Sequence, residues 1–131
     1  MSGAVTWKSE PDEHDYPAAG SYLSLIAPAA QVEDLVERLR VAPIEHYKAK
    51  DMLRASRLAL LPADNPHVAA DLAKVKKQQA LSPVLIVRGS IADGVEAQIA
   101  DGYHRVCASF YLDENTDIPC RIVDLTPPAR A

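Results

Sequence analysis

Apolar residues recur at helical spacing through the first half of the chain. Four of them stand at i, i+3, i+4 and i+7 and predict an amphipathic helix: Val32, Leu35, Val36 and Leu39. Pro43 limits this helix, and a shorter one is expected over residues 18–26. Residues 1–17 are polar and broken by prolines, so we expect an irregular arm held down by Trp7 or Tyr16.

A further helix is predicted over residues 44–58. Three of its side chains are expected to face inward: Tyr47, Met52 and Ala55. Four cations are expected on wetter faces: Lys48, Lys50, Arg54 and Arg57. The polar set of Lys48, Lys50, Asp51 and Arg54 is expected to be a solvated ladder rather than a surface that binds nucleotide or substrate. Residues 1–60 are thus predicted to form a helical N-terminal cover, and the Asn65-Pro66 pair after them marks a turn.

In the second half, short strands alternate with helices. The predicted order is helix, strand, strand, helix, strand, over residues 67–79, 84–87 and 95–99, the segment after Gly102, and residues 118–123. Pro119 places the last strand at a sheet edge or is its first residue, because proline cannot donate to a neighbouring strand. This order predicts an α/β (α+β) fold in which helices pack against a small mixed sheet.

The chain has 131 residues, of which 48% are apolar, so we expect one domain over residues 1–131. Within it, residues 61–125 are predicted to be the core and residues 126–131 a tail. No apolar stretch approaches the ~20 residues that cross a bilayer. The first residues also lack the basic start and apolar stretch of a signal peptide. We therefore expect a cytoplasmic protein without a membrane partner.

Charge is distributed unevenly along the chain. The net charge of −4 divides into −6 for residues 1–37, +6 for residues 38–91 and −4 for residues 92–131. The acidic total argues against a general nucleic-acid coat. The cationic middle is interpreted first as a set of solvated helix faces and second as a surface that attracts phosphate.

Cysteine and histidine spacing predicts no metal site. Cys107 and Cys120 lack C-x-x-C spacing and are expected to be buried and reduced. The four histidines show no zinc-binding pattern.

The most specific chemistry lies at residues 101–105, between a predicted strand and a predicted helix. Gly102 permits a sharp turn and the close approach of a ligand. Asp101 can cap the helix. The free N–H groups of the first helical turn form an anion site, to which His104 and Arg105 add donors. The alternative is a capped helix whose histidine and arginine bond only to nearby carboxylates.

Three segments together resemble the ParB N-terminal/sulfiredoxin-like superfamily: residues 98–108 (QIADGYHRVCA), 81–87 (LSPVLIV) and 118–123 (IPCRIV). The resemblance runs from about Val68 to Leu125, under half of the chain. It implies a fold that holds ATP or CTP with Mg²⁺. The phosphates would be held by Gly102, His104 and Arg105, with Tyr103 and Lys74 as further candidate ligands.

The chain departs from two branches of that superfamily, the sulfiredoxins and the ParB proteins. Sulfiredoxins have a catalytic cysteine directly before the His-Arg pair, where this chain has Tyr103, so true sulfiredoxin activity is not expected. Along the preceding helix, sulfiredoxins offer Lys, Ser and Thr to the nucleotide, where this chain has His67, Ala70 and Lys74. ParB proteins append a DNA-reading helix-turn-helix, whereas six residues follow Leu125 here, so specific DNA binding is not expected.

A third branch, similar to free serine kinases, has an Asp-Gly-His box in which the aspartate helps catalysis. Asp101 matches that position and is the candidate catalytic residue, although a simple helix cap is the preferred interpretation. The expected function is an ATP- or CTP-dependent phosphotransferase or hydrolase acting on a small molecule or a protein. The alternative is a non-catalytic module that binds protein or nucleic acid and retains a degenerate nucleotide box.

Overall fold

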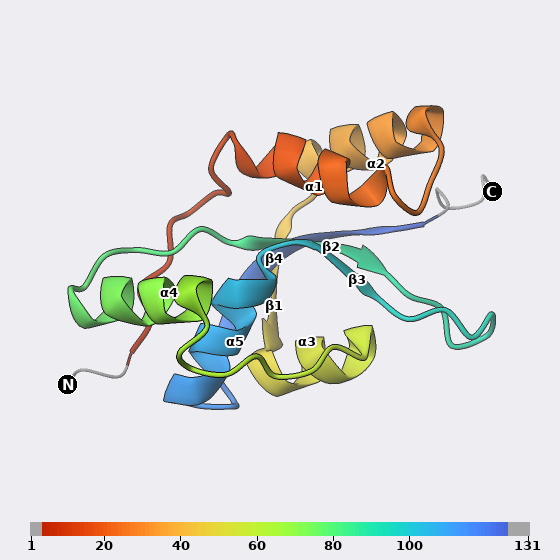
Figure 1. Cartoon of the computed structure of the whole chain (residues 1–131). Helices are drawn as coiled ribbons and strands as arrows, with labels where there is room; N and C mark the ends of the chain where they lie inside the picture. Colours follow the sequence, from red (N-terminus) through yellow and green to blue (C-terminus); the bar gives the residue numbers. More distant parts are fainter. Residues whose placement is uncertain (1–3, 126–131) are drawn as a thin grey trace.

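A computed structural model describes residues 4–125 of the chain (Figure 1). These residues form five helices and four strands: α1 (Asp15–Leu23), α2 (Ala29–Val41), β1 (Ile44–Lys48), α3 (Ala49–Ser56), α4 (Pro66–Lys76), β2 (Val84–Arg88), β3 (Gln98–Asp101), α5 (Tyr103–Leu112) and β4 (Asp117–Asp124). The predicted α+β class with a mixed sheet is confirmed. The predicted tail, residues 126–131, lies outside the described residues.

The sheet has the strand order β1-β4-β2-β3 and separates two layers of helices (Figure 1). Strand β4 runs antiparallel to β1 and parallel to β2, and β2 runs antiparallel to β3. Helices α1 and α2 cover one face, and α3, α4 and α5 cover the other. The continuous apolar run of β2 serves both layers, because Leu85 and Val87 pack on one face while Val84 and Ile86 pack on the other.

The predicted amphipathic helix is α2. Val32, Leu35 and Leu39 are buried against the sheet, as the stripe requires. Helix α1 begins at Asp15, three residues before the predicted start, because proline is tolerated in a first helical turn and Pro17 occupies that turn.

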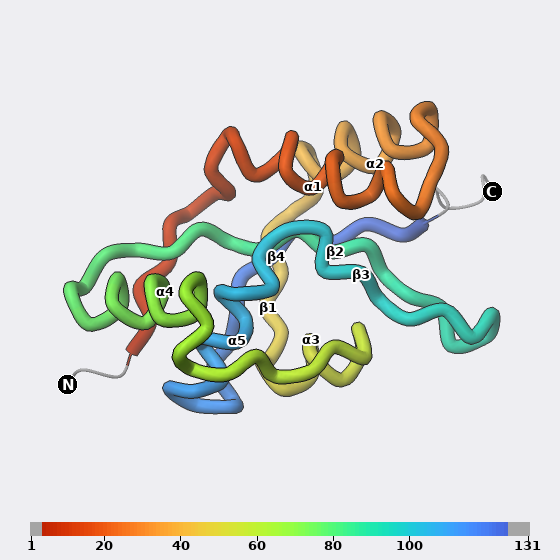
Figure 2. The backbone as a smooth tube through the Cα atoms, viewed as in Figure 1, coloured from red at the N-terminus to blue at the C-terminus, as the bar shows by residue number. Residues whose placement is uncertain are grey.

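The N-terminal arm is held down at both predicted points. Trp7 forms an isolated bridge with Leu81, and the Lys8 N–H donates to the Leu81 carbonyl at 2.8 Å. Tyr16 lies in the first turn of α1, where it is buried against α2 and the sheet. Figure 2 shows the arm running beside the segment that leads into β2. The N-terminal arm is thereby joined to the segment that precedes β2.

The prediction of one helix over residues 44–58 is wrong in its first part. Residues 44–48 form strand β1, which pairs antiparallel with Asp117–Arg121 of β4. Helix α3 then begins at Ala49 on the opposite side of the sheet from α1 and α2. Pairing with a distant strand overrides the helical pattern, because strand preference depends on cross-strand packing. Met52 is buried as expected, whereas Ala55 is exposed and Tyr47 is half-buried. The region predicted as a helical cover therefore contributes an edge strand to the sheet.

The last strand is also placed differently from the prediction. Strand β4 begins at Asp117 and lies between β1 and β2, so Pro119 is neither its first residue nor on an edge strand. Its pairing with β2 starts only at Cys120, while Pro119 lies opposite His46 of β1. The strand therefore gains its second neighbour just after the residue that lacks an N–H donor, which reconciles a proline with a central strand.

The second strand of the hairpin is shorter than predicted. Strand β3 covers residues 98–101 rather than 95–99, and Val95 forms only an isolated bridge with Ser90. Cys107 and Cys120 are buried and free, as predicted. Burial raises the pKa of the Cys120 thiol to about 12. No helix within residues 4–125 is long and apolar enough to span a bilayer.

Candidate functional site

The sequence-predicted site lies where β3 leads into α5. Asp101 ends the strand, and Gly102 takes φ +112° at the N-terminal boundary of the helix. The predicted cap by Asp101 is wrong, because no side chain in the described part of the chain caps this helix. Asp101 Oδ2 accepts a hydrogen bond from Arg105 Nη2 at 3.0 Å instead. The N–H groups of the first turn of α5 are thus left without a side-chain acceptor.

Arg105 lies between two carboxylates, and we call these three residues the α5 ion cluster. Its Nη2 is 3.0 Å from Asp101 Oδ2 and 3.8 Å from Asp15 Oδ2. It also donates to the Pro83 carbonyl at 3.3 Å. Asp15, whose side chain is 4% exposed, accepts a further bond from Ser82 Oγ at 2.9 Å. The cluster therefore ties α1 and the start of β2 to the first turn of α5.

Asp101 is the candidate catalytic residue, and its surroundings change its acidity. Burial raises the pKa of its carboxyl, while Arg105 opposes the rise by charge and by hydrogen bonding. A raised pKa makes the carboxylate a better proton acceptor, but the bond to Arg105 occupies one of its oxygens. The observed bond therefore places Asp101 to hold Arg105.

Gly102 makes the predicted sharp turn, but the group that approaches it belongs to the protein. A Cβ atom added there would lie 2.3 Å from Val84 Cγ1 and 2.8 Å from Val84 Cβ. The absence of a side chain thus lets β2 pack directly against the turn. Positive φ and close packing together require glycine at this position.

Tyr103 packs as a half-buried residue. Its ring lies against the cluster of buried residues under α5, and its hydroxyl donates to the Ala59 carbonyl at 2.5 Å. This bond attaches the segment after α3 to the start of α5. These contacts favour the packing interpretation of Tyr103 over direct ligand contact.

His104 meets side chains of α4 at what we call the α4–α5 surface, formed by His67, Asp71, Lys74 and His104. The rings of His67 and His104 lie 4.7 Å apart between centroids, at 42° to each other. Burial lowers the pKa of His104, and the neighbouring His67 lowers it further. The His104 ring therefore favours the neutral form at neutral pH.

Asp71 is the acidic residue of this surface, and basic side chains lie near it. Burial raises the pKa of its carboxyl. Four groups act against that rise through their charge: Arg105, Lys74, His104 and His67. Three of the predicted ligands, Lys74, His104 and Arg105, therefore act by charge on a carboxylate that the sequence analysis did not name.

The residues that the sequence analysis missed differ in how visible they were. His67, Asp71 and Lys74 follow i, i+4 and i+7 spacing, which places all three on one face of α4, so a closer reading of that helix could have found Asp71. Asp15 had no such signal. It lies 90 residues before Arg105 and reaches it only because α1 packs over the sheet.

The cationic middle of the sequence is largely neutralised in the structure. Half of its lysines and arginines form ion pairs: Arg38 with Asp34, Arg40 with Glu13, Lys50 with Glu114, Arg54 with Asp51, and Arg88 with Asp124. Most of these carboxylates come from the two acidic thirds. For these five paired residues, the interpretation as solvated faces is therefore favoured over a surface that attracts phosphate. Lys74, Lys76 and Lys77 on or next to α4 have no ion pair within residues 4–125.

A group of possible metal ligands lies at the start of α1. One ligand atom each from Asp12, His14 and Asp15 falls within 4.8 Å of the others. Both carboxylates already have protein partners, since Asp12 pairs with Lys8 at 2.8 Å and Asp15 accepts from Ser82. This group is accounted for by the contacts that hold the N-terminal arm.

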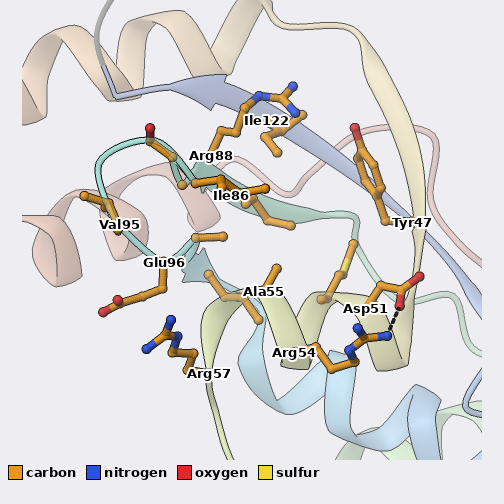
Figure 3. A pocket seen from close by; sticks show the side chains of 17 residues that line it. Tyr47, Asp51, Arg54, Ala55, Arg57, Ile86, Arg88, Val95, Glu96 and Ile122 are labelled. Atoms are coloured by element: carbon orange, nitrogen blue, oxygen red, sulfur yellow. Dashed lines mark ion pairs between the residues drawn. The ribbon is translucent and has the colours of Figure 1, made fainter.

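A pocket of about 570 Å³ lies apart from the start of α5, between α3 and the hairpin of β2 and β3 (Figure 3). Its floor is apolar, and arginines and carboxylates stand around it. None of residues 101–105 lines it. The sequence analysis did not predict this pocket, because its walls come from three separate segments without a motif.

Comparison of the chain with protein-family models, with curated proteins and with solved structures finds no match in any of the three. Two regions of the molecule therefore bear on function: the start of α5 and the pocket between α3 and the hairpin. One offers donors for an anion at the start of a helix, and the other offers a pocket with an apolar floor.

Proposed function

We propose that this chain binds a nucleoside triphosphate, ATP or CTP, with its phosphates at the first turn of α5 and at the α4–α5 surface. One observation carries the proposal: the first turn of α5 has neither a side-chain cap nor an acidic residue, and it lies beside His104, His67 and Lys74. A helix N-terminus carries a partial positive charge and free N–H donors, both of which favour phosphate.

The side chains around this turn have the chemistry that phosphate oxygens require. Lys74 contributes an ammonium group, and the two imidazoles contribute N–H donors. Arg105 is held in place by Asp101 and adds positive charge beneath the turn. In this proposal Asp101 is a positioning residue for Arg105, and its raised pKa also suits it to accept a proton during phosphoryl transfer or hydrolysis.

Asp71 fits the requirement of Mg²⁺ for a carboxylate oxygen. It is half-buried, forms no ion pair within residues 4–125 and lies among the groups proposed to bind phosphate. When bound, the nucleotide with its Mg²⁺ would supply the phosphoryl group. The residues of the chain would bind and orient it, with Asp71 holding the metal side and Lys74 and His104 the phosphate side.

The resemblance to the ParB/sulfiredoxin-like superfamily in sequence supports the same proposal. Of the phosphate ligands that this resemblance implies, the proposal keeps His104 and Arg105, together with Lys74. A nucleoside triphosphate with Mg²⁺ as ligand supports a cytoplasmic location. Specific DNA binding is not part of the proposal, because half of the basic residues in the cationic middle are paired with carboxylates.

Isothermal titration of the full chain with MgATP and with MgCTP tests the proposal. We expect one of them to bind, and we expect Lys74→Gln and His104→Asn each to weaken binding about tenfold. Lys76→Gln is the matched control, because it removes an exposed cation from the same helix. Equal affinity in all four proteins, or no binding by the unchanged chain, would contradict the proposal.

Phosphate release from the bound nucleotide separates an enzyme from a non-catalytic module. If Asp101 accepts a proton in the reaction, Asp101→Asn abolishes turnover while the circular dichroism spectrum and nucleotide affinity stay close to those of the unchanged chain. Binding without any turnover in the unchanged chain supports the module instead.

A further inference from the structure

The pocket under α3 has an apolar floor that extends across the sheet. Its apolar side chains come from α3, β2, β3 and β4 and include Met52, Ile86, Ile99 and Ile122. Its volume of about 570 Å³ falls in the range of small-molecule sites. The floor therefore suits the apolar body of a small ligand.

Most charges around this pocket are already paired. Arg54 Nη1 lies 3.5 Å from Asp51 Oδ1, and Arg88 Nε lies 2.7 Å from Asp124 Oδ1. Two lining charges of opposite sign have no ion pair within residues 4–125: Arg57 and Glu96. A ligand that carries one negative and one positive group would complement both.

The two unpaired charges lie at the same end of the pocket (Figure 3). Arg57 follows the last residue of α3, and Glu96 precedes β3. A hydrogen bond of 3.0 Å from the Ala97 N–H to the Ala55 carbonyl joins these two segments. The geometry thus holds a guanidinium and a carboxylate near each other beside the apolar floor.

Arg57 also has an unusual backbone conformation. It takes φ +56° and ψ +33°, a left-handed conformation that glycine or asparagine usually supplies after a helix. Strained backbone of this kind concentrates at functional sites. An arginine at this position has a cost to stability that a ligand contact would explain.

From these contacts we propose that the pocket binds an α-amino acid with a large apolar side chain. Its carboxylate would accept from the Arg57 guanidinium, whose planar fork matches two oxygens. Its ammonium group would donate to Glu96, and its side chain would lie on Met52, Ile86 and Ile122. This site is separate from the proposed nucleotide site, since no residue of the α5 ion cluster or the α4–α5 surface lines it.

Three compounds with one aromatic body test the proposal: L-phenylalanine, 3-phenylpropanoate, which lacks the ammonium group, and 2-phenylethylamine, which lacks the carboxylate. Binding to the full chain is measured by chemical-shift changes of backbone amides. We expect phenylalanine to bind at least about tenfold more tightly than either analogue, since each lost contact is a charge-assisted hydrogen bond. The shifts are expected at residues of α3 and the hairpin.

Two variants separate the two charges. Arg57→Gly is expected to remove the preference for phenylalanine over phenylethylamine without lowering the melting temperature, because glycine suits the left-handed conformation. Glu96→Gln is expected to remove the preference for phenylalanine over 3-phenylpropanoate. Lys50→Gln is the matched control, since it removes a cation from α3 that does not line the pocket.

The position of the ligand is tested by filling the pocket. Ala55 lines it from an exposed helix position, so Ala55→Trp is expected to abolish binding while the chain stays folded. Equal affinity for all three compounds, or phenylalanine binding unchanged in Arg57→Gly and Ala55→Trp, would overturn the proposal. Either result would leave the nucleotide proposal at α5 untouched, because the two sites share no residues.

Discussion

The start of α5 and the pocket under α3 use charged side chains in opposite ways. At the start of α5, Arg105 is 16% exposed and faces two carboxylates that are 4% and 18% exposed. At the pocket, Arg57 is exposed and Arg88 pairs with a carboxylate that is 50% exposed. The first region holds helices together, whereas the second leaves charges beside an open apolar floor.

This difference shows that most side chains of a conspicuous motif can serve the fold. Residues 101–105 attract attention in the sequence, yet the structure uses Asp101, Gly102, Tyr103 and Arg105 for internal contacts. The His104 side chain instead packs against His67 of α4 and stays partly exposed to solvent. The pocket has no motif, but its unpaired charges and its apolar floor suit a ligand. Ligand binding is thus better argued from unpaired groups than from residue types.

The largest expected effect comes from removing the central cation of the α5 ion cluster. Arg105→Leu leaves Asp15 and Asp101 as buried carboxylates without a cation, so we expect the free energy of unfolding to fall by about 3–5 kcal/mol. Urea unfolding measures it. Arg88→Leu at the pocket is the matched change, and breaking that exposed pair is expected to cost less than about 1 kcal/mol. Similar losses in both variants would refute the contrast between the two regions.

The second comparison uses one glycine from each region. Gly102→Ala places a Cβ atom 2.3 Å from Val84 Cγ1 at φ +112°, so we expect a loss of about 2–3 kcal/mol. Gly94, which lines the pocket at φ +68°, has no atom within 4 Å of its added Cβ, so Gly94→Ala is expected to cost about 1 kcal/mol of backbone strain alone. Urea unfolding of both variants checks that Gly102→Ala loses more stability than Gly94→Ala. A smaller loss for Gly102→Ala would show that the start of α5 is loosely packed in solution.

The smallest effect concerns the acidity of His104. Burial and His67 lower its pKa below the ordinary value of 6.5, so the folded chain binds this proton less tightly than the unfolded chain. Its contribution to stability is therefore complete above pH 6.5 and is lost as the pH falls from there through the lower folded-state pKa. Titration of the imidazole by NMR is expected to give a midpoint below 6.5, and His67→Asn is expected to raise it. A midpoint at or above 6.5 would contradict the packing of the two rings.

Several elements could be predicted from the sequence because local pattern and tertiary packing agree. The stripe of Val32, Leu35 and Leu39 forms α2, and the apolar run at residues 84–87 forms a strand buried on both faces. Gly102 marks a real turn between strand and helix. The prediction failed at residues 44–48, where the helical pattern continued but pairing with β4 imposed a strand.

The sequence alone determined the α+β class, the order of most elements, and the placement of His104 and Arg105 just after a strand-to-helix turn. Tertiary structure alone decided that β1 joins the sheet, that Asp15 completes the α5 ion cluster, and that α3 and the hairpin enclose a pocket. The physical reason is the sequence separation over which each kind of interaction acts. Helical spacing and turn chemistry act within a few residues, whereas strand pairing, ion clusters and pockets join residues that only the folded chain brings together.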